Sequence, residues 1–179
     1  MAEQTKPIRD EATRLCKSET LSKFKLFTGF KEEELTTLLS LSDFQTFQPG
    51  ARIVTQDEPG LCMYVILRGA VRVHSRAGDQ EVELAELHSG DFFGELSLVD
   101  DGPRSATVDA VEETQVLRIT RMVVGVLAGV QPSAAIHLLA AIGRSLVNRL
   151  RAGNQKYLDL ILLGHKESAP SASAPDPAT

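Results

Sequence analysis

The stretch GDFFGELSLVDDGPRSATVDA, residues 90–110, holds the residue types best suited to binding an anion. Glu95 follows Gly94 and opens a short apolar run, long enough for about one helical turn, which the turn-forming residues DDGP then end. A helix N-terminus after a glycine offers free backbone N–H groups and the positive end of the helix dipole. Arg104 lies on the far side of the loop, where its guanidinium could bind the same anion through two donors.

Glu95 and Ser105 narrow the chemistry of that anion. Glu95 would repel a bare phosphate, but its carboxylate can accept a hydrogen bond from a neighbouring hydroxyl group. Ser105 adds a hydroxyl donor. An anion with adjacent hydroxyl groups is a sugar phosphate or a nucleotide. The alternative, which the two charged residues alone would favour, is an ordinary loop ion pair between Glu95 and Arg104, worth about 0–1 kcal/mol.

Short β-prone runs separated by glycines surround this stretch, from residue 43 to about residue 119. Glycines that recur about every 8–12 residues between such runs are typical of an antiparallel sandwich or barrel. Apolar residues alternate in two runs, Val71 with Val73 and Val82 with Leu84, which predicts one inward face on each strand. We therefore expect an α+β fold, mainly β: an antiparallel β-roll or jelly roll with N-terminal helices and a C-terminal helix. The runs are 51–56, 61–68, 70–76, 81–87, 105–111 and 114–120.

Helical patterns flank the β region. Residues 7 to about 42 are predicted to be helical, with residues 1–23 as an N-terminal extension. The period returns after residue 120, and a narrow apolar seam over 133–163 predicts contact with one partner helix. Gly153 and Asn154 interrupt that seam, so the helix is expected to bend or end there. The Ser-, Ala- and Pro-rich segment 164–179 is predicted to be disordered. The seam consists of Leu139, Ile142, Leu146, Leu150, Gly153, Tyr157 and Leu160.

Composition excludes several classes of protein. A net charge of −5 over 179 residues disfavours a sequence-independent nucleic-acid binder. The polar N-terminus and the short apolar runs predict neither a signal peptide nor a membrane span, and so a cytoplasmic protein. Cys16 and Cys62 lack metal-ligand spacing and are expected to be reduced thiols.

An enzyme with a metal centre in a β-roll is the first rival. Such a site needs several histidines and a carboxylate around one metal. The four histidines form neither an HxH nor an HxxxH pair, and no nucleophile with a base stands out. We therefore expect no catalytic residues, no metal and no cofactor.

The segment FGELSLVDDGPRSATV, residues 93–108, resembles the phosphate-binding cassette of the cyclic-nucleotide-binding domain family, of the catabolite activator and cyclic-AMP-dependent kinase regulatory subunit type. LFTGFKEEELTTLL resembles the family's entry helix, and residues 47–73 resemble its first strands and glycine turns. The resemblance covers roughly residues 24–163, which we take as the domain. With the whole cassette in place, ligand binding is favoured over a loop ion pair.

The resemblance implies a role for each matching residue. Glu95 would accept the ribose 2′-hydroxyl, and Arg104 would pair with the exocyclic oxygens of the cyclic phosphate. A C-terminal lid helix aligned through Arg149 and Leu150 places Asn154 at a base-contacting position. Ser105 does not decide between the two cyclic nucleotides; cyclic AMP is favoured over cyclic GMP on the likeness to bacterial members. The backbone cradle would involve Gly94, Leu96, Ser97, Ser105 and Ala106, the apolar floor Val73, Leu84 and Leu96, and Phe93 completes the ligand-binding set.

The expected function is that of a sensor module that switches its C-terminal helix and signals to an unidentified effector protein. A homodimer through that helix is the favoured assembly. No direct DNA binding is expected, because only the tail 164–179 follows the position where the family attaches a helix-turn-helix domain. The alternatives are a structural or protein-interaction β-roll that has lost the ligand, and a fragment of a larger cyclic-nucleotide-regulated protein.

Overall fold

The computed structural model describes residues 21–167. The chain is divided into two compact units, one up to Ile142 and the other from Gly143, and each is described by itself. The first unit contains the β-strands and most of the short helices, and the second consists of the distal part of one long helix.

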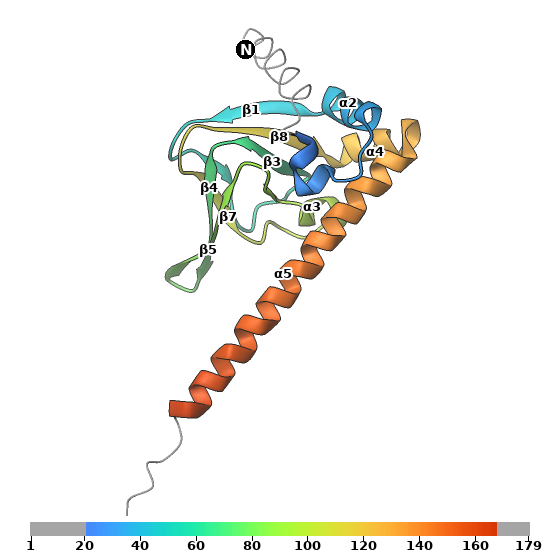
Figure 1. Cartoon of the computed structure of the whole chain (residues 1–179). Coiled ribbons are helices and arrows are strands. Elements are labelled where there is room, and N and C mark those ends of the chain that lie inside the picture. The colour runs from blue at the N-terminus through green and yellow to red at the C-terminus, as the bar shows by residue number, and fades with distance from the viewer. Residues whose placement is uncertain (1–20, 168–179) are drawn as a thin grey trace, which may run out of the picture. The chain divides into compact units, whose positions relative to one another are not determined.

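Within the described residues, eight strands form two four-stranded antiparallel sheets (Figure 1). The first sheet has the order β1 (Asp43–Phe47), β8 (Thr114–Thr120), β3 (Cys62–Arg68) and β6 (Phe92–Phe93). The second has the order β2 (Arg52–Val54), β7 (Thr107–Ala110), β4 (Ala70–Ala77) and β5 (Gln80–His88). The expectation of an α+β fold, mainly β, with an antiparallel roll and a C-terminal helix is confirmed.

The core lies between the two sheets. β3 is buried along nearly its whole length, as its unbroken apolar sequence requires of a strand covered on both faces. Tyr64 of β3 stacks on Phe93 of β6, with ring centroids 5.2 Å apart. β1 and β6 were not among the predicted runs, because the first carries polar residues and the second has only two residues. The central cluster is Val54, Cys62, Tyr64, Ile66, Val71, Phe93, Val108 and Val116.

β5 departs from the regular alternation that its sequence predicts. Val73 pairs with Ala85 and His74 with Glu83, so Leu84 is the extra residue of a β-bulge. Val82 and Leu84 are exposed, and the predicted inward face through these two residues is wrong. The bulge interrupts the regular alternation of side chains, and β5 is the edge strand of its sheet, paired on one side only.

The N-terminal part of the unit is not one helix. Residues 7–20 lie outside the described residues, and 21–27 form two 3₁₀ turns, η1 (Leu21–Lys23) and η2 (Lys25–Phe27). Gly29 has a φ of 92°, a left-handed conformation that a helix interior does not contain, and α2 begins only after it. The helix α2 covers Glu32–Leu41.

Three further helices follow the cassette and the roll. α3 (Leu96–Val99) is a single turn, α4 covers Arg121–Val130, and α5 covers Pro132–Glu167. The last helix was expected to bend or end at Gly153, and the ending is wrong, since α5 continues through this residue. The glycine costs about 1 kcal/mol, and the neighbouring helix-favouring residues offset that cost. α5 also includes residues 164–167 of the predicted tail, and the rest of the tail, 168–179, lies outside the described residues.

Candidate functional site

The cassette residues come together around one short turn. β6 leads to Gly94, whose φ of 74° is a left-handed conformation that favours glycine, and Glu95 is then the N-cap residue of α3. Glu95 and Ser97 are buried, with Glu95 only 2% exposed. The N–H of Ser97 donates to the carbonyl of Gly94 at 3.3 Å, which closes the turn. The chain thus reverses direction with two polar side chains turned away from solvent.

Arg104 is a buried cation, 8% exposed, on the other side of this turn. Its Nη1 donates to the carbonyl oxygen of Cys62 (2.7 Å), the carbonyl of Gly94 (3.1 Å) and the hydroxyl of Ser97 (2.8 Å). Its Nη2 lies 3.4 Å from the Cys62 Sγ. Within residues 21–167 these acceptors are neutral groups, and no carboxylate forms an ion pair with Arg104. A buried cation without a protein counter-ion is suited to pairing with a bound anion.

The turn before β3 fixes the backbone of Arg104. The N–H of Arg104 donates to the carbonyl of Glu58, and the N–H of Asp57 donates to the carbonyl of Arg104, both at 2.9 Å. Gly60 lies directly against the guanidinium: a Cβ there would come within 3.0 Å of Arg104 Nε and Ser97 Oγ. Sequence reasoning treated Gly60 as turn punctuation only and missed this role. The Pro-Gly pair just before a buried strand was the available signal.

A second arginine holds the other end of α3. Arg121, the first residue of α4, donates from Nε to the carbonyl of Ser97 at 2.7 Å, and its Nη2 donates to the carbonyl of Asp100. Its Nη1 pairs with the carboxylate of Asp101. The last carbonyls of a helix have no partner within the helix, and a cation there satisfies them. Arg121 therefore ties the cassette to the start of α4.

The three residues of the predicted apolar floor differ in how far their side chains are buried. Leu84 is 52% exposed and Leu96 is 42% exposed, whereas Val73 is half-buried and packs against the core. Leu96 directly precedes Ser97, whose hydroxyl accepts a hydrogen bond from Arg104, so its exposed side chain lies next to the cassette. These three residues stay a predicted floor.

The remaining predicted residues lie in different surroundings. Phe93 is buried in the core, where it stacks on Tyr64. The burial of Tyr64 raises the pKa of its own hydroxyl to about 12. Ser105 is exposed and Ala106 half-buried, both next to Arg104 in the chain. Asn154 is exposed and belongs to α5 in the second unit, so its role as base reader stays a prediction.

The described part of the chain contains neither a group of side chains placed to hold a metal ion nor a helix suited to span a membrane. No group of three or more His, Cys, Asp or Glu side chains placed to hold a metal ion occurs among those residues. No described helix combines the length and apolar character needed to cross a bilayer. Cys62 is a buried free thiol, and Cys16 lies outside the described residues.

Comparison with models of protein families matches residues 44–127 to the cyclic nucleotide-binding domain. Residues 44–127 belong to the cyclic nucleotide-binding domain family. The matched range begins within β1 and ends within α4, so this domain includes the whole cassette and Arg121.

Named relatives share the domain. The cyclic AMP receptor protein of Thermus thermophilus is 38% identical over 144 residues, which are 80% of this chain and 63% of that protein. The cAMP-dependent protein kinase regulatory subunit of Dictyostelium discoideum is 33% identical over 122 residues, 60% of this chain and 37% of that protein. The chain thus spans less than two thirds of each of these two relatives.

A solved structure has the same architecture. The crystal structure of the N-terminal domain of a transcriptional regulator from Streptomyces coelicolor A3(2) superposes with a TM-score of 0.66 at 29% identity. The superposition covers 75% of this chain and 95% of that one. The cyclic nucleotide-binding domain of this chain therefore has the fold of a domain that was solved on its own.

Proposed function

We propose that this chain is a regulatory module that binds cyclic AMP in preference to cyclic GMP through the cassette around Arg104. The observation that carries the proposal is the burial of the Arg104 guanidinium among neutral acceptors, next to Gly94 and Ser97. A cyclic phosphate supplies the missing negative charge, and a guanidinium binds phosphate oxygens through paired donors. The names of the Thermus and Dictyostelium relatives support cyclic AMP as the ligand.

The other cassette residues divide the remaining contacts. Glu95 accepts the ribose 2′-hydroxyl, since a buried carboxylate accepts hydrogen bonds and repels a second anion. The backbone amides of Gly94, Leu96, Ser97, Ser105 and Ala106 line the phosphate. The exposed side chains of Leu84 and Leu96 lose their contact with water when base and ribose cover them, at about 25 cal/mol per Å² of apolar area.

The module is non-catalytic and acts in the cytoplasm, within a domain that we place at residues 24–163. Cyclic nucleotide binds the closed state of the module more tightly than the open state, and this difference in affinity shifts the equilibrium toward the closed state. Asn154 reads the base edge from α5, and an unidentified effector protein receives the change. The module contacts neither DNA nor membrane.

A second copy of the chain is the partner we propose for α5. Val147, Leu150, Asn154, Tyr157 and Ile161 recur at alternating steps of three and four residues, the spacing of a two-helix seam. All five are exposed within the second unit. A single asparagine in such a seam fixes the register of two helices, and it is compatible with contact to a ligand base.

Isothermal titration with cyclic AMP and cyclic GMP tests the proposed ligand, after any carried-over nucleotide has been removed. We expect micromolar or tighter binding of cyclic AMP and weaker binding of cyclic GMP. Arg104→Ala should weaken cyclic AMP binding by about 2–5 kcal/mol, because it leaves a buried phosphate charge unpaired. Arg68→Ala, which removes an exposed arginine at the end of β3 and outside the cassette, is the matched control.

Two outcomes contradict this assignment. An Arg104→Ala protein that binds cyclic AMP within threefold of the parent removes Arg104 from the site. A folded, nucleotide-free parent that binds neither ligand leaves the structural β-roll module as the function.

A further inference from the structure

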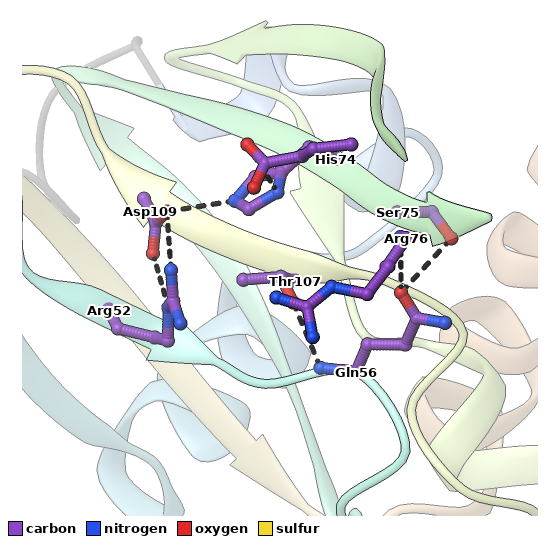
Figure 2. Close-up of polar contacts among 8 residues, drawn as sticks. Arg52, Gln56, His74, Ser75, Arg76, Thr107 and Asp109 are labelled. Atoms are coloured by element: carbon purple, nitrogen blue, oxygen red, sulfur yellow. Dashed lines mark hydrogen bonds and ion pairs between the residues drawn. The ribbon is translucent and has the colours of Figure 1, made fainter. Parts of the chain in front are cut away.

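A polar network covers the outer face of the second sheet, opposite the core. Arg72 pairs with Asp109 and His74 with Thr107 in the β4–β7 register, so these residues share the face turned away from Val71 and Val73. His74 is 4% exposed although it lies on this outer face. Figure 2 shows its ring held on β4 close to Asp109 of β7, which in turn contacts Arg52 of β2.

Both ring nitrogens of His74 contact a carboxylate. Nε2 lies 2.8 Å from Oδ2 of Asp109, and Nδ1 lies 3.1 Å from Oε1 of Glu81 on β5. A neutral imidazole has a single N–H and can donate to only one of them, whereas the imidazolium donates to both. The geometry therefore fits a doubly protonated ring that ties β5 to β4 and β7.

Asp109 remains an acceptor whatever happens to the ring. Arg52 binds its carboxylate with two donors, at 2.9 and 3.2 Å. The hydrogen bond from Arg52, followed by that from His74, lowers the pKa of Asp109. When the imidazole loses a proton, water can replace the ring as a donor to the exposed Glu81 more readily than to the half-buried Asp109, so the remaining N–H stays on Asp109 and Glu81 is released.

The released segment is the one that carries the predicted floor residue of the site. His74 stands opposite Glu83, directly beside the bulge at Leu84, where the β4–β5 ladder is already interrupted. The contact between His74 and Glu81 is a side-chain tie across this weak point. The other charged residues on this face are Arg72, Arg76, Glu83 and Glu86, which pair across β4, β5 and β7.

We propose that His74 is a positioning residue: its imidazolium holds the β5 bulge that carries Leu84, and cyclic nucleotide affinity therefore depends on the charge of this ring. This inference rests on the proposed function, because Leu84 is taken as part of the ligand floor. The direction follows from the proton count. Affinity is highest when His74 is charged and falls when the ring loses its proton.

Titration calorimetry with cyclic AMP between about pH 5.5 and pH 8.5, where histidine changes charge, tests the link. Since couplings between sites commonly change affinity by a factor of five or more, we expect about fivefold weaker binding at the alkaline end. His74→Gln should show no such pH profile and should bind as weakly as the parent does at high pH. His88→Gln is the matched control: His88 is an exposed residue of β5 with one carboxylate partner, and its removal should leave the profile intact.

A second variant covers the case in which His74→Gln fails to fold. Glu81→Gln keeps His74 and Asp109 together and cuts only the tie to β5, so its profile should also be flat. A parent with pH-independent affinity overturns the inference, and so does a profile that persists in both variants. If the two substitutions only damaged the structure, both variants would bind cyclic AMP more weakly, but the affinity of the parent would not depend on pH.

A readout without ligand separates this inference from the proposed function. NMR of the parent should show two protonated ring nitrogens on His74 at low pH, and a Leu84 methyl signal that shifts with the same midpoint. A parent that binds no cyclic nucleotide at any pH overturns the proposed function, and with it the proposed dependence of cyclic nucleotide affinity on pH. A Leu84 methyl signal that ignores the His74 titration overturns the positioning role even when cyclic AMP binds.

Discussion

Gly60 has no side chain, and this allows the Arg104 guanidinium to pack directly against its backbone. The side chains of Arg104 and Ser97 fill the space that a Cβ at residue 60 would need. Gly94 is constrained twice, by its left-handed φ and by Arg104 Nη1, which would lie 2.7 Å from an added Cβ. The cassette thus depends on two glycines, from two separate segments of the chain, that both lie against the Arg104 side chain.

Gly60→Ala should displace Arg104 and weaken cyclic AMP binding about tenfold or more, with a loss of about 1–3 kcal/mol in the free energy of unfolding, as overpacking in a buried site does. Titration calorimetry and urea unfolding measure the two effects. Gly125→Ala is the control, since a Cβ there meets nothing within 4 Å and the substitution should leave affinity unchanged. Parent-like affinity in Gly60→Ala would show that Arg104 can rearrange without loss.

Local spacing predicted that Arg104 and the helix start after Gly94 bind the same anion, because both lie in one loop. Gly60 could not be assigned in this way. Its neighbours in space come from a segment that β-pairing brings alongside, through the bridge between Pro59 and Pro103. A period-two or loop pattern contains no information about such a contact, which arises only when the sheets form.

At the scale of elements, glycine-separated runs predicted the principal strands of the roll. The β5 bulge was not predictable, because Val82 and Leu84 alternate as they would in a regular strand and the register is set by pairing with β4. The turns at Leu21–Phe27 lie inside the helix that was predicted from residue 7 to about residue 42. In the structure Phe24 and Phe27 stack within these turns, with ring centroids 6.2 Å apart.

Glu34 connects α2 to the first turns of α5. It is buried and accepts hydrogen bonds from the hydroxyl of Ser133, from the backbone N–H of Lys31 and from His137. The Ser133 hydrogen bond, with the others, lowers the pKa of Glu34 from 4.5 to about 2. A lowered pKa means that the ionised carboxylate is the stabilised form, so the link is complete above about pH 4.5 and is lost as pH falls toward 2.

Glu34→Gln should therefore lower the unfolding midpoint near neutral pH, and the difference from the parent should shrink as the pH falls below about 4.5. Urea unfolding of both proteins at neutral and acidic pH measures this convergence. Glu33→Gln, on the exposed side of the same helix turn, should match the parent throughout. A deficit in Glu34→Gln that stays constant into acid would mean that its charge contributes nothing.

At the scale of the whole molecule, the sequence-based seam combines two kinds of residue. Ile142 is buried within the first unit, whereas the exposed stripe begins at Val147 in the second. Periodicity reports that residues share a helix face, but not which partner covers that face. The division of the chain at Gly143 is a property of tertiary packing that no local pattern contains.

Leu150→Asp should convert a dimeric chain into a monomer, because it places a charge in the middle of the proposed two-helix seam. Leu150 is 65% exposed within its own chain, so the substitution should leave the β-roll folded. Light scattering coupled to size exclusion measures the mass. Ala152→Asp introduces the same charge on the opposite face of α5 and should remain dimeric; a parent of monomer mass would contradict the proposed seam.

The edge position of β5 also sets how well separate copies of the chain tolerate crowding. An edge strand offers unpaired backbone groups to any neighbour, and exposed apolar residues such as Val82 and Leu84 increase the risk of sheet-to-sheet aggregation. Glu81, Glu83 and Glu86 put like charges along that edge, so two copies repel one another before their strands can pair. Neutralising substitutions at Glu83 and Glu86 remove much of this repulsion, and colloidal stability then decreases while the fold of each copy is unchanged.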